Sequence, residues 1–481
     1  MMNMDCMKLR PVTVADVLSA RDARVERQKR MLLAHGLPLI SFTMNIAGEI
    51  KRDAWIEQAF LEGVRRIEAA LAADGIAVAA RERTLAFTGC EEIWAVDAPA
   101  QELKARMCAI EEMDALGRLF DIDVIDADGY KLERPMERRC LICGGPVRAC
   151  ARSRTHSARE LSERAHEIIF AFLNEKRASE IGELAHRALI REANVTPKPG
   201  LVDRENSGAH RDMDLKLFHA SADALRPWFE DCARIGLELR DTAPEQVFAR
   251  LRKRGIEAEN AMFAATNGVN THKGALFSLG ILCCAAAMEA AGAGVPAKLN
   301  SAADEGATKQ AKLNRAETDA RTQAILDRAA ALARPALNDL TALHPWDART
   351  GGEVQYLASG RTGVRGEAAA GFPHARDYGL PALKRALQDG ASFNEACLHA
   401  LLALMARVED SNVLRRRGAE ALRSVQSRAK ALLERGFTTD DLRRMNDDFV
   451  RENLSPGGSA DLLAVTIFLY EIQNTNGGDS I

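Results

Sequence analysis

The chain has 481 residues, which is longer than a single domain usually grows, so we expect two or more domains. Hydrophobic residues make up 47% of the chain and charged residues 28%, a globular composition that argues against disorder. The formal net charge of -3 provides no overall positive field. We therefore expect no nucleic-acid partner and no attraction to an anionic membrane.

The expected compartment is the cytoplasm. The first residues lack the basic and then apolar order of a signal peptide, and no stretch reaches the ~20 apolar residues that a membrane span needs. The longest uncharged run, residues 274–288, predicts a helix packed inside a helical domain. The 10 cysteines are scattered and do not resemble a disulfide framework, so we expect reduced thiols.

Hydrophobic periodicity predicts a mixed α+β unit in the first part of the chain. A helix over residues 14–34 ends at Gly36 and Pro38. The segments that follow are a strand, a helix, two strands, a helix and a strand, at residues 37–46, 55–71, 76–88, 92–96, 101–116 and 119–125. This βαββαβ order is that of a ferredoxin-like sandwich.

Periodicity changes in the second part of the chain. Residues 131–157 have weak periodicity and resemble a linker, and from residue 159 nearly every segment has helical spacing. Polar loops interrupt the helices at residues 196–206, 266–274 and 455–459. We therefore predict a multidomain protein, with the α+β domain at residues 1–158 and a large all-α domain at residues 159–481.

Two polar clusters of the first half indicate phosphate chemistry. Arg21, Arg24 and Gln28 share one face of the first predicted helix, which suits a polyphosphate or is simply a solvated charged face. Asp121 and Asp123 lie two residues apart on a predicted strand, so both point to one side of the sheet. Such a pair can hold Mg²⁺ against a phosphate, or it can lie at an exposed sheet edge near a turn.

A group of cysteines follows in the linker-like segment. Cys140, Cys143 and Cys150, with His156, have the ligand types of a Cys₃His zinc site, provided that the chain forms a tight knuckle there. The alternative is a turn with reduced thiols and no metal. Arg152 and Arg154 lie in the same segment and offer a second anion-binding cluster.

In the second half, polar residues gather first in a proline-stiffened loop. Lys198 lies between two prolines, which restrict the backbone around it. Asp203, His210, Asp212 and Asp214 follow closely, and the last two are candidates for a second Mg²⁺ site. A surface loop would also explain this polarity.

Further candidate residues lie where loops enter helices. Asn270, His272 and Lys273 precede the long apolar helix, and a helix start with such side chains is a good phosphate site. Arg365, Glu367 and Asp461 lie in or beside glycine-containing loops. Asp461 has a simpler explanation too, because an acid in the first turn stabilises a helix by ~0.3–1 kcal/mol. Together these clusters predict a nucleoside-triphosphate site without a P-loop.

These motifs resemble two known families that are joined here in one chain. Residues 10–160 resemble the apo-citrate lyase phosphoribosyl-dephospho-CoA transferases, in the segments that contain Arg21 to Gln28, Gly36 to Asn45, Asp121 with Asp123, and Arg139 to Ser157. Residues 180–475 resemble the triphosphoribosyl-dephospho-CoA synthases, in the segments Thr196 to Asp203, Asn267 to Gly274, Arg365 to Glu367 and Ser455 to Asp461. Arg417 departs from the pattern, where we expect glycine.

The resemblance implies a two-step pathway. The second half would join ATP to 3′-dephospho-CoA and release adenine, with Lys198, His272 and Lys273 on the triphosphate. Asp203, Asn270, Arg365 and Glu367 would complete the nucleotide site. Asp212 or Asp461 would stabilise the ribosyl cation while another carboxylate or His210 takes the proton of the acceptor hydroxyl.

For the first half, the resemblance implies transfer of the product to a serine of the apo citrate lyase acyl carrier (gamma) subunit, with Mg²⁺ on Asp121 and Asp123. Two other interpretations stay open at this stage. One is the same pair of activities for the carrier protein of malonate decarboxylase. The other is a non-catalytic helical protein that binds coenzyme A or nucleic acid.

Overall fold

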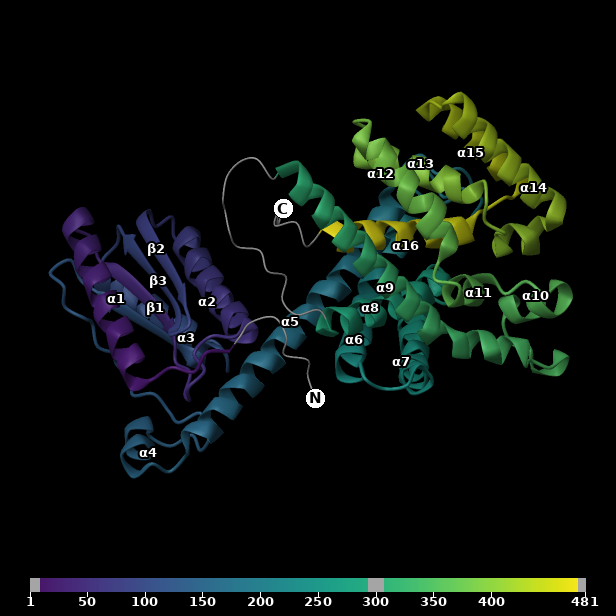
Figure 1. Ribbon diagram of the computed structural model, residues 1–481. Helices are drawn as coiled ribbons and strands as arrows, with labels where there is room; N and C mark the ends of the chain where they lie inside the picture. Colours follow the sequence, from purple (N-terminus) through teal and green to yellow (C-terminus); the bar gives the residue numbers. More distant parts are fainter. Residues whose placement is uncertain (1–8, 293–306, 475–481) are drawn as a thin grey trace. The chain divides into compact units, whose positions relative to one another are not determined.

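The computed structural model describes residues 9–292 and 307–474, which form two compact units (Figure 1). The first unit extends to Glu175 and the second begins at Lys176. Glu175 and Lys176 both lie within one helix, α5 (Ala158–Asn194), so the division between the units comes later in the chain than the predicted boundary at residues 158 and 159. The first turns of α5 contribute Ile169 to the core of the first unit, and its later turns contribute Leu189 to the core of the second.

The first unit is an α+β structure, as the sequence predicts. Its elements are α1 (Val14–His35), β1 (Leu39–Met44), α2 (Ala54–Ala73), β2 (Val78–Ala86), β3 (Gly89–Val96), α3 (Ala100–Glu112), β4 (Phe120–Ile125) and the short α4 (Val147–Ser153). The four strands form an antiparallel sheet in the order β2-β3-β1-β4. Each predicted strand and helix is present within a few residues of its expected position.

The two faces of this sheet carry different side chains because neighbouring residues of a strand point in opposite directions. Phe42 and Trp94 belong to the larger core, which includes residues of α2 and α3. Leu39 and Ile93 point to the other face and pack with Met31 of α1. Figure 1 shows α1 and α2 on opposite sides of the sheet. Polar residues on the α1 side therefore lie beside a small apolar cluster.

The first turn of α2 is joined to α5 by a charged hydrogen bond. Asp53 caps α2 by accepting the N–H of Ile56 at 2.7 Å, and its other oxygen contacts Nε2 of His166 at 2.9 Å. Nδ1 of His166 donates to the carbonyl of Ser162 at 2.8 Å. Because both partners can only accept, the imidazolium form satisfies both bonds, and the hydrogen bond to Asp53 raises the pKa of His166.

The second unit is helical throughout its described part. After α5 come α6 (Leu215–Glu238), α7 (Pro244–Ala265), α8 (Lys273–Gly292), α9 (Ala307–Thr341), α10 (Gly351–Ser359), α11 (Gly363–Ala369), α12 (Leu380–Gln388), α13 (Phe393–Met405), α14 (Ser411–Arg435), α15 (Thr439–Glu452) and α16 (Gly457–Asn474). One core contains residues from most of these helices.

Helix α8 lies inside that core. By length and composition its segment Lys273–Ala290 is apolar enough to cross a membrane, but 78% of the segment is buried within the protein. Cys283 and Cys284 are fully buried, as small core residues are expected to be. Packing against α6, α9 and α16 therefore accounts for the apolar character of α8.

We expect that, after the Asp53→Asn substitution, the stability of the first turn of α2 no longer depends on the protonation of His166. The pKa of His166 is raised above its ordinary value of 6.5, so the stabilisation is complete below that pH and is lost as the pH rises through the higher folded value. Asparagine still caps the helix. Hydrogen exchange of this turn, corrected for the intrinsic rate, should lose protection as the pH rises above 6.5 in the original protein only. An equal loss in both proteins would contradict this coupling, and Asp22→Asn on α1 is the control.

Candidate active sites

A cavity of about 1480 Å³ lies in the second unit. The N-terminal turns of five helices line it, with Lys273 of α8, Gly351 of α10, Gly363 of α11, Ser411 of α14 and Gly457 of α16. The first N–H groups of a helix have no partner within the helix, and the helix dipole is positive at this end. The cavity is therefore suited to a ligand with several negative charges.

The cavity brings together most of the residues predicted for the second half. They come from distant parts of the sequence and are Lys198, His210, Asp212, Asn270, His272, Lys273, Arg365, Glu367 and Asp461. Asn270 accepts the backbone N–H of Lys273 at 3.3 Å, so it caps α8 as expected. Asp212 has an exposed side chain near His210. The structure thus gathers these motifs around one space.

Asp203 and Asp214 do not line this cavity. The carboxylate of Asp203 is buried and accepts the backbone N–H groups of Lys198, Glu205 and Asn206 at 2.7–2.9 Å. It therefore shapes the loop rather than facing a ligand. Asp214 caps α6 by accepting the N–H of Leu217 at 2.9 Å. Of the predicted Asp212 and Asp214 magnesium pair, only Asp212 lines the cavity.

Lys198 forms a buried ion pair. Its side chain is 1% exposed, and Nζ donates to Oε1 of Glu192 at 2.6 Å and to the carbonyl of Glu192 at 2.7 Å. Sequence reasoning missed Glu192, which lies near the end of a regular helix without any motif. Lys198 itself could have indicated such a partner, because a lysine that is buried in an apolar loop needs an acidic group to neutralise its charge.

Two further carboxyl groups, those of Asp410 and Asp461, lie near this ion pair. Burial raises the pKa of Asp461 well above its usual range, and the charges of Glu192 and Asp410 raise it further. Burial also raises the pKa of Asp410, which accepts the N–H of Asn412 at 3.0 Å and of Ser459 at 2.9 Å. Asp410 thereby joins the starts of α14 and α16. These effects favour the protonated form of Asp461, which also lines the cavity.

The backbone of α8 approaches Asp461 very closely. If Gly274 carried a Cβ atom, that atom would overlap Oδ2 of Asp461. Glycine at this position therefore leaves the space in which the carboxyl group lies. The sequence motif Asn270 to Gly274 is explained in part by this contact, which joins it to the distant motif that contains Asp461.

His272 presents a free hydrogen-bond donor to the cavity. Its side chain is buried, and Thr271 donates to Ser221 at 2.7 Å, so the Ser221 hydroxyl donates in turn to Nδ1 at 2.8 Å. Burial, with smaller contributions from Lys198 and His219, lowers the pKa of His272 to about 3. The neutral ring thus carries its proton on Nε2, which has no partner among the residues that the structure describes.

His210 has both ring nitrogens engaged. Nε2 contacts the Ser455 hydroxyl at 2.7 Å, and Nη2 of Arg416 donates to Nδ1 at 3.3 Å. Burial and then the charge of Arg416 lower the pKa of His210.

Arg417, the departure from the expected glycine, is exposed, and Gly418 beside it has open space around its Cα. Arg417 therefore does not crowd this part of the cavity.

Two of the predicted cationic side chains at the cavity are paired with acids. Lys273 contacts Glu259, and Nη2 of Arg365 donates to Oε1 of Glu353 at 2.8 Å. Burial opposes ionisation of Glu353, but hydrogen bonds from Arg349, Arg365 and Thr350 lower its pKa to about 2. Glu367 contacts Nδ1 of His374 at 2.7 Å. Sequence reasoning missed Glu353, Glu259 and His374, because their importance depends on these contacts.

The predicted phosphate residues of the first unit meet on the α1 side of the sheet. The strand register places Asp123 opposite Ser41 and Asp121 opposite Thr43. Gln28 of α1 donates to the hydroxyl of Ser41 at 2.9 Å. Arg24, one turn earlier on the same helix, donates to Glu91 of β3 at 3.1 Å. The two aspartates therefore share one side of the sheet, as we expected, and Arg24 and Gln28 lie on that same side.

Cations that the sequence analysis did not select also contact these aspartates. Nζ of Lys131 lies 2.5 Å from Asp123, and Nη2 of Arg138 lies 3.4 Å from Asp121. Both come from the segment with weak periodicity, where no pattern marked them. Arg21 is exposed and has no ion-pair partner among the described residues. The side chain of Asp121 is 50% exposed, so a ligand can reach it.

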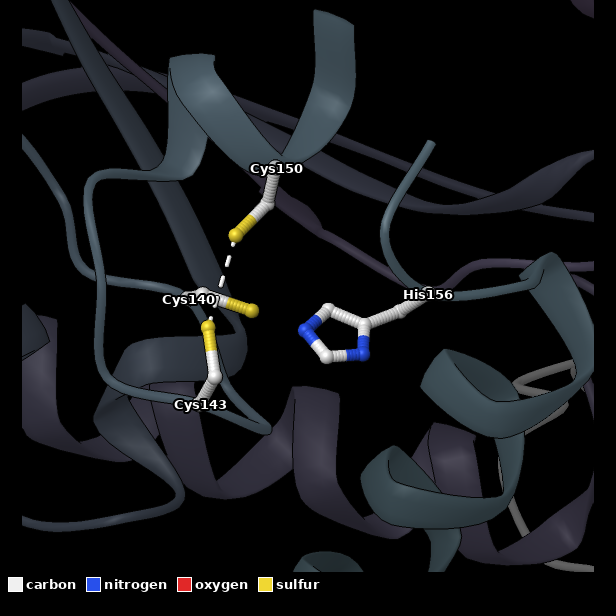
Figure 2. A group of neighbouring side chains, drawn as sticks. All are labelled: Cys140, Cys143, Cys150 and His156. Atoms are coloured by element: carbon white, nitrogen blue, oxygen red, sulfur yellow. Dashed lines mark hydrogen bonds between the residues drawn. The ribbon is translucent and has the colours of Figure 1, made fainter. Parts of the chain in front are cut away.

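The cysteines of the first unit form a compact group (Figure 2). The ligand atoms of Cys140, Cys143, Cys150 and His156 all lie within 4.8 Å of one another. Arg152 and Arg154 are exposed on and just beyond α4 and do not join this group. The predicted knuckle geometry is therefore present.

Comparisons with known proteins identify the family. The model of the CitG family, "ATP:dephospho-CoA triphosphoribosyl transferase", matches residues 178–480, and that of the CitX family, "Apo-citrate lyase phosphoribosyl-dephospho-CoA transferase", matches residues 12–172. "Protein CitXG" of Haemophilus influenzae is 32% identical over 96% of this chain and 97% of its own length. The chain belongs to the CitXG family. Each compact unit corresponds to one of the two matched families.

Other relatives agree with this assignment. "Protein CitXG" of Leuconostoc mesenteroides is 30% identical over 96% of this chain and 97% of its own length. A "Probable 2-(5''-triphosphoribosyl)-3'-dephosphocoenzyme-A synthase" of Vibrio cholerae is 40% identical over 61% of this chain and 88% of its own length. The chain is therefore a transferase, which excludes the non-catalytic binding protein. The family descriptions do not favour the malonate decarboxylase alternative.

We expect Gly274→Ala to lower the triphosphoribosyl transferase activity about 100-fold, because the new methyl group displaces the carboxyl group of Asp461. The fold should survive, since a side-chain end can move. The matched control is Gly255→Ala in α7, where the added methyl group lies at an ordinary 3.5 Å from Trp228. Adenine release by both variants, with thermal unfolding as the check on folding, measures the difference. Full activity of Gly274→Ala would show that the position of Asp461 is unimportant.

Proposed function

We propose that the second unit makes the prosthetic group of citrate lyase and that the first unit attaches it. The second unit joins C1″ of the ATP ribose to the 2′-hydroxyl of 3′-dephospho-CoA and releases adenine. The first unit transfers the product to a serine of the apo acyl carrier (gamma) subunit and releases pyrophosphate. The observation that carries the proposal is the cavity of helix N-termini around Asp461, a carboxyl group with a raised pKa, in a unit of the triphosphoribosyl transferase family.

Helix starts hold the triphosphate in this proposal. Lys273 and Arg365 are already paired with acids. Arg415 and Arg416 line the cavity and have no ion-pair partner among the described residues. These arginines and the positive ends of the helix dipoles supply the attraction. Nε2–H of His272 adds one donor, and it stays a neutral donor because the pKa of the ring is low. Lys198, which we expected on the triphosphate, instead neutralises Glu192 beneath the site.

Asp461 is the acid of the proposed reaction. The bond between C1″ and N9 of adenine breaks while the bond between C1″ and the 2′-oxygen forms. The protonated carboxyl group gives its proton to the departing adenine, and the carboxylate that results takes the proton of the 2′-hydroxyl. We assign both transfers to Asp461 rather than His210, because both ring nitrogens of His210 are already hydrogen-bonded.

We assign the first unit to the ferredoxin-like class because of the order of its elements along the chain and of its strands in the sheet. This unit acts on the α1 side of its sheet. Asp121 and Asp123 would hold Mg²⁺, which supplies charge neutralisation for pyrophosphate when bound. Arg138 contacts Asp121, Arg24 lies on the same side of the sheet, and both bind the phosphates. The serine oxygen forms a bond to the phosphorus on the ribose side, the bond to pyrophosphate breaks, and the serine proton leaves to solvent or to a carboxylate of this pair. We place the whole pathway in the cytoplasm.

The direct test is a coupled assay with the purified chain. ATP, Mg²⁺ and 3′-dephospho-CoA are added first and free adenine is measured. The apo acyl carrier subunit is then added and its mass is determined. We expect adenine release followed by the mass gain of one phosphoribosyl-dephospho-CoA group. Absence of adenine would overturn the role of the second unit, and an unchanged carrier mass would overturn that of the first.

We expect Asp461→Asn to lower the rate of adenine release by about 10² to 10⁴, the usual contribution of general acid and base catalysis. The amide cannot donate the same proton, although its size is nearly unchanged. Transfer of separately prepared triphosphoribosyl-dephospho-CoA to the carrier should continue at the original rate. The matched control is Asp241→Asn, whose side chain is 87% exposed. A similar decrease of adenine release in Asp241→Asn, or no decrease in Asp461→Asn, would exclude Asp461 as the acid of the reaction.

We expect the opposite pattern from Asp121→Asn. Carrier modification should decrease about 100-fold or more, because one of the two carboxylates that face the pyrophosphate is lost. Adenine release should be unchanged. Asp128→Asn, in the exposed turn after β4, is the control for the loss of a nearby charge. Full carrier modification by Asp121→Asn, measured by mass spectrometry over time, would rule out the metal-binding role.

A further inference from the structure

We propose that Cys140, Cys143, Cys150 and His156 bind one structural zinc ion in the first unit. The ligand atoms lie within 4.8 Å of one another, and Figure 2 shows the three sulfurs and the imidazole directed toward a common centre. In a tetrahedral zinc site with Zn–S distances of about 2.3 Å, neighbouring sulfurs are about 3.8 Å apart. The Sγ atoms of Cys143 and Cys150 are 3.4 Å apart, so only small shifts are needed.

The backbone is folded to deliver these ligands. The N–H of Gly144 donates to the carbonyl of Cys140 at 3.1 Å, and the N–H of Cys140 donates to the carbonyl of Gly145 at 2.7 Å. Gly144 has a φ of 69°, which closes this turn and brings Cys143 beside Cys140. Cys150 lies on α4. A left-handed residue, Arg154, ends that helix and turns the chain back toward the sulfurs.

The histidine supplies a second, independent observation. Nε2 of His156 is buried and has no hydrogen-bond partner among the described residues. A buried polar nitrogen without a partner costs free energy, and a ring that faces three sulfurs gains little from them as neutral thiols. A metal ion removes this cost, because it binds the ring nitrogen and the thiolates together. Three sulfurs and one imidazole in this arrangement favour zinc over magnesium or calcium.

The ion has a clear structural task. The segment from Lys131 to Ser157 contains little regular structure, and α4 has no buried residue. Of the described residues of this segment, Leu141 alone packs against the apolar core of the unit, so the core holds little of it in place. Small units without a sufficient core commonly use a metal site of four protein ligands for this purpose. With all four positions taken by the protein, the ion has no open position for a substrate. We therefore assign it to structure rather than to catalysis.

The site also bears on the transfer reaction. Nη2 of Arg118 donates to the carbonyls of Arg139 and Cys140 at 2.7 and 3.1 Å, which joins the knuckle to the turn before β4. Arg138, two residues before Cys140, lies 3.4 Å from Asp121. The metal would therefore fix a cation beside the proposed phosphate site. Only this consequence rests on the proposed function, and zinc binding itself does not.

Metal analysis of the full chain tests the proposal. After purification in zinc-containing medium and dialysis, we expect about one zinc ion per chain. Cys143→Ser and Cys150→Ser should lose it, while Cys108→Ser, which removes a buried thiol elsewhere in the same unit, should retain it. Replacement of zinc by cobalt(II) should produce the absorption of a tetrahedral thiolate site. Adenine release by each variant confirms that the second unit is intact.

Three results would overturn the proposal. They are a chain without zinc under these conditions, equal zinc loss in Cys108→Ser, and a disulfide between Cys143 and Cys150 in non-reduced peptide maps of the freshly purified protein. If zinc is present, its removal by a chelator should lower carrier modification about tenfold, with adenine release unchanged. If the original protein binds zinc but modifies no carrier, the proposed function fails while the zinc site stands.

Discussion

The buried ion pair between Lys198 and Glu192 is the constraint on which the chemistry of the second unit depends. Both side chains are almost fully buried, so removing either one would leave an uncompensated charge in the interior. The lysine compensates only one of three neighbouring carboxyl groups, because Asp410 and Asp461 lie close to the pair. Burial, and then the charges of Glu192 and Asp410, raise the pKa of Asp461. The surroundings of the ion pair thereby favour a proton on a carboxyl group that faces the cavity.

The same unit attracts anions through helix starts as well as through cationic side chains. Lys273 and Arg365 are paired with acids, whereas the starts of five helices open onto the cavity. Arg415 and Arg416 also line it and have no ion-pair partner among the described residues. A helix start is fixed in direction and loses no side-chain entropy when a ligand binds. This arrangement explains how a chain with a net charge of -3 can bind a triphosphate.

The first unit gathers its charged groups for phosphate chemistry in a different way. Its carboxylates lie on strands, where alternation places Asp121 and Asp123 on one face and the α1 helix brings Arg24 to the same side. The surrounding segment lacks a core of its own and gathers thiols and an imidazole instead. A face of this kind is open at its edge, as the half-exposed side chain of Asp121 indicates. Such openness suits a macromolecular acceptor, whereas the enclosed cavity of the second unit suits small nucleotides.

The sequence by itself determined the features that depend on neighbouring residues. Helix α1 and its glycine end, the βαββαβ order and the shared face of Asp121 and Asp123 follow from periodicity and local backbone preferences. The tertiary structure alone decided that Lys198 pairs with Glu192, that Gly274 leaves room for Asp461, and that Asp214 lies outside the cavity. The physical reason is that burial and charge coupling arise between segments far apart in the chain, and no local pattern records which of them meet.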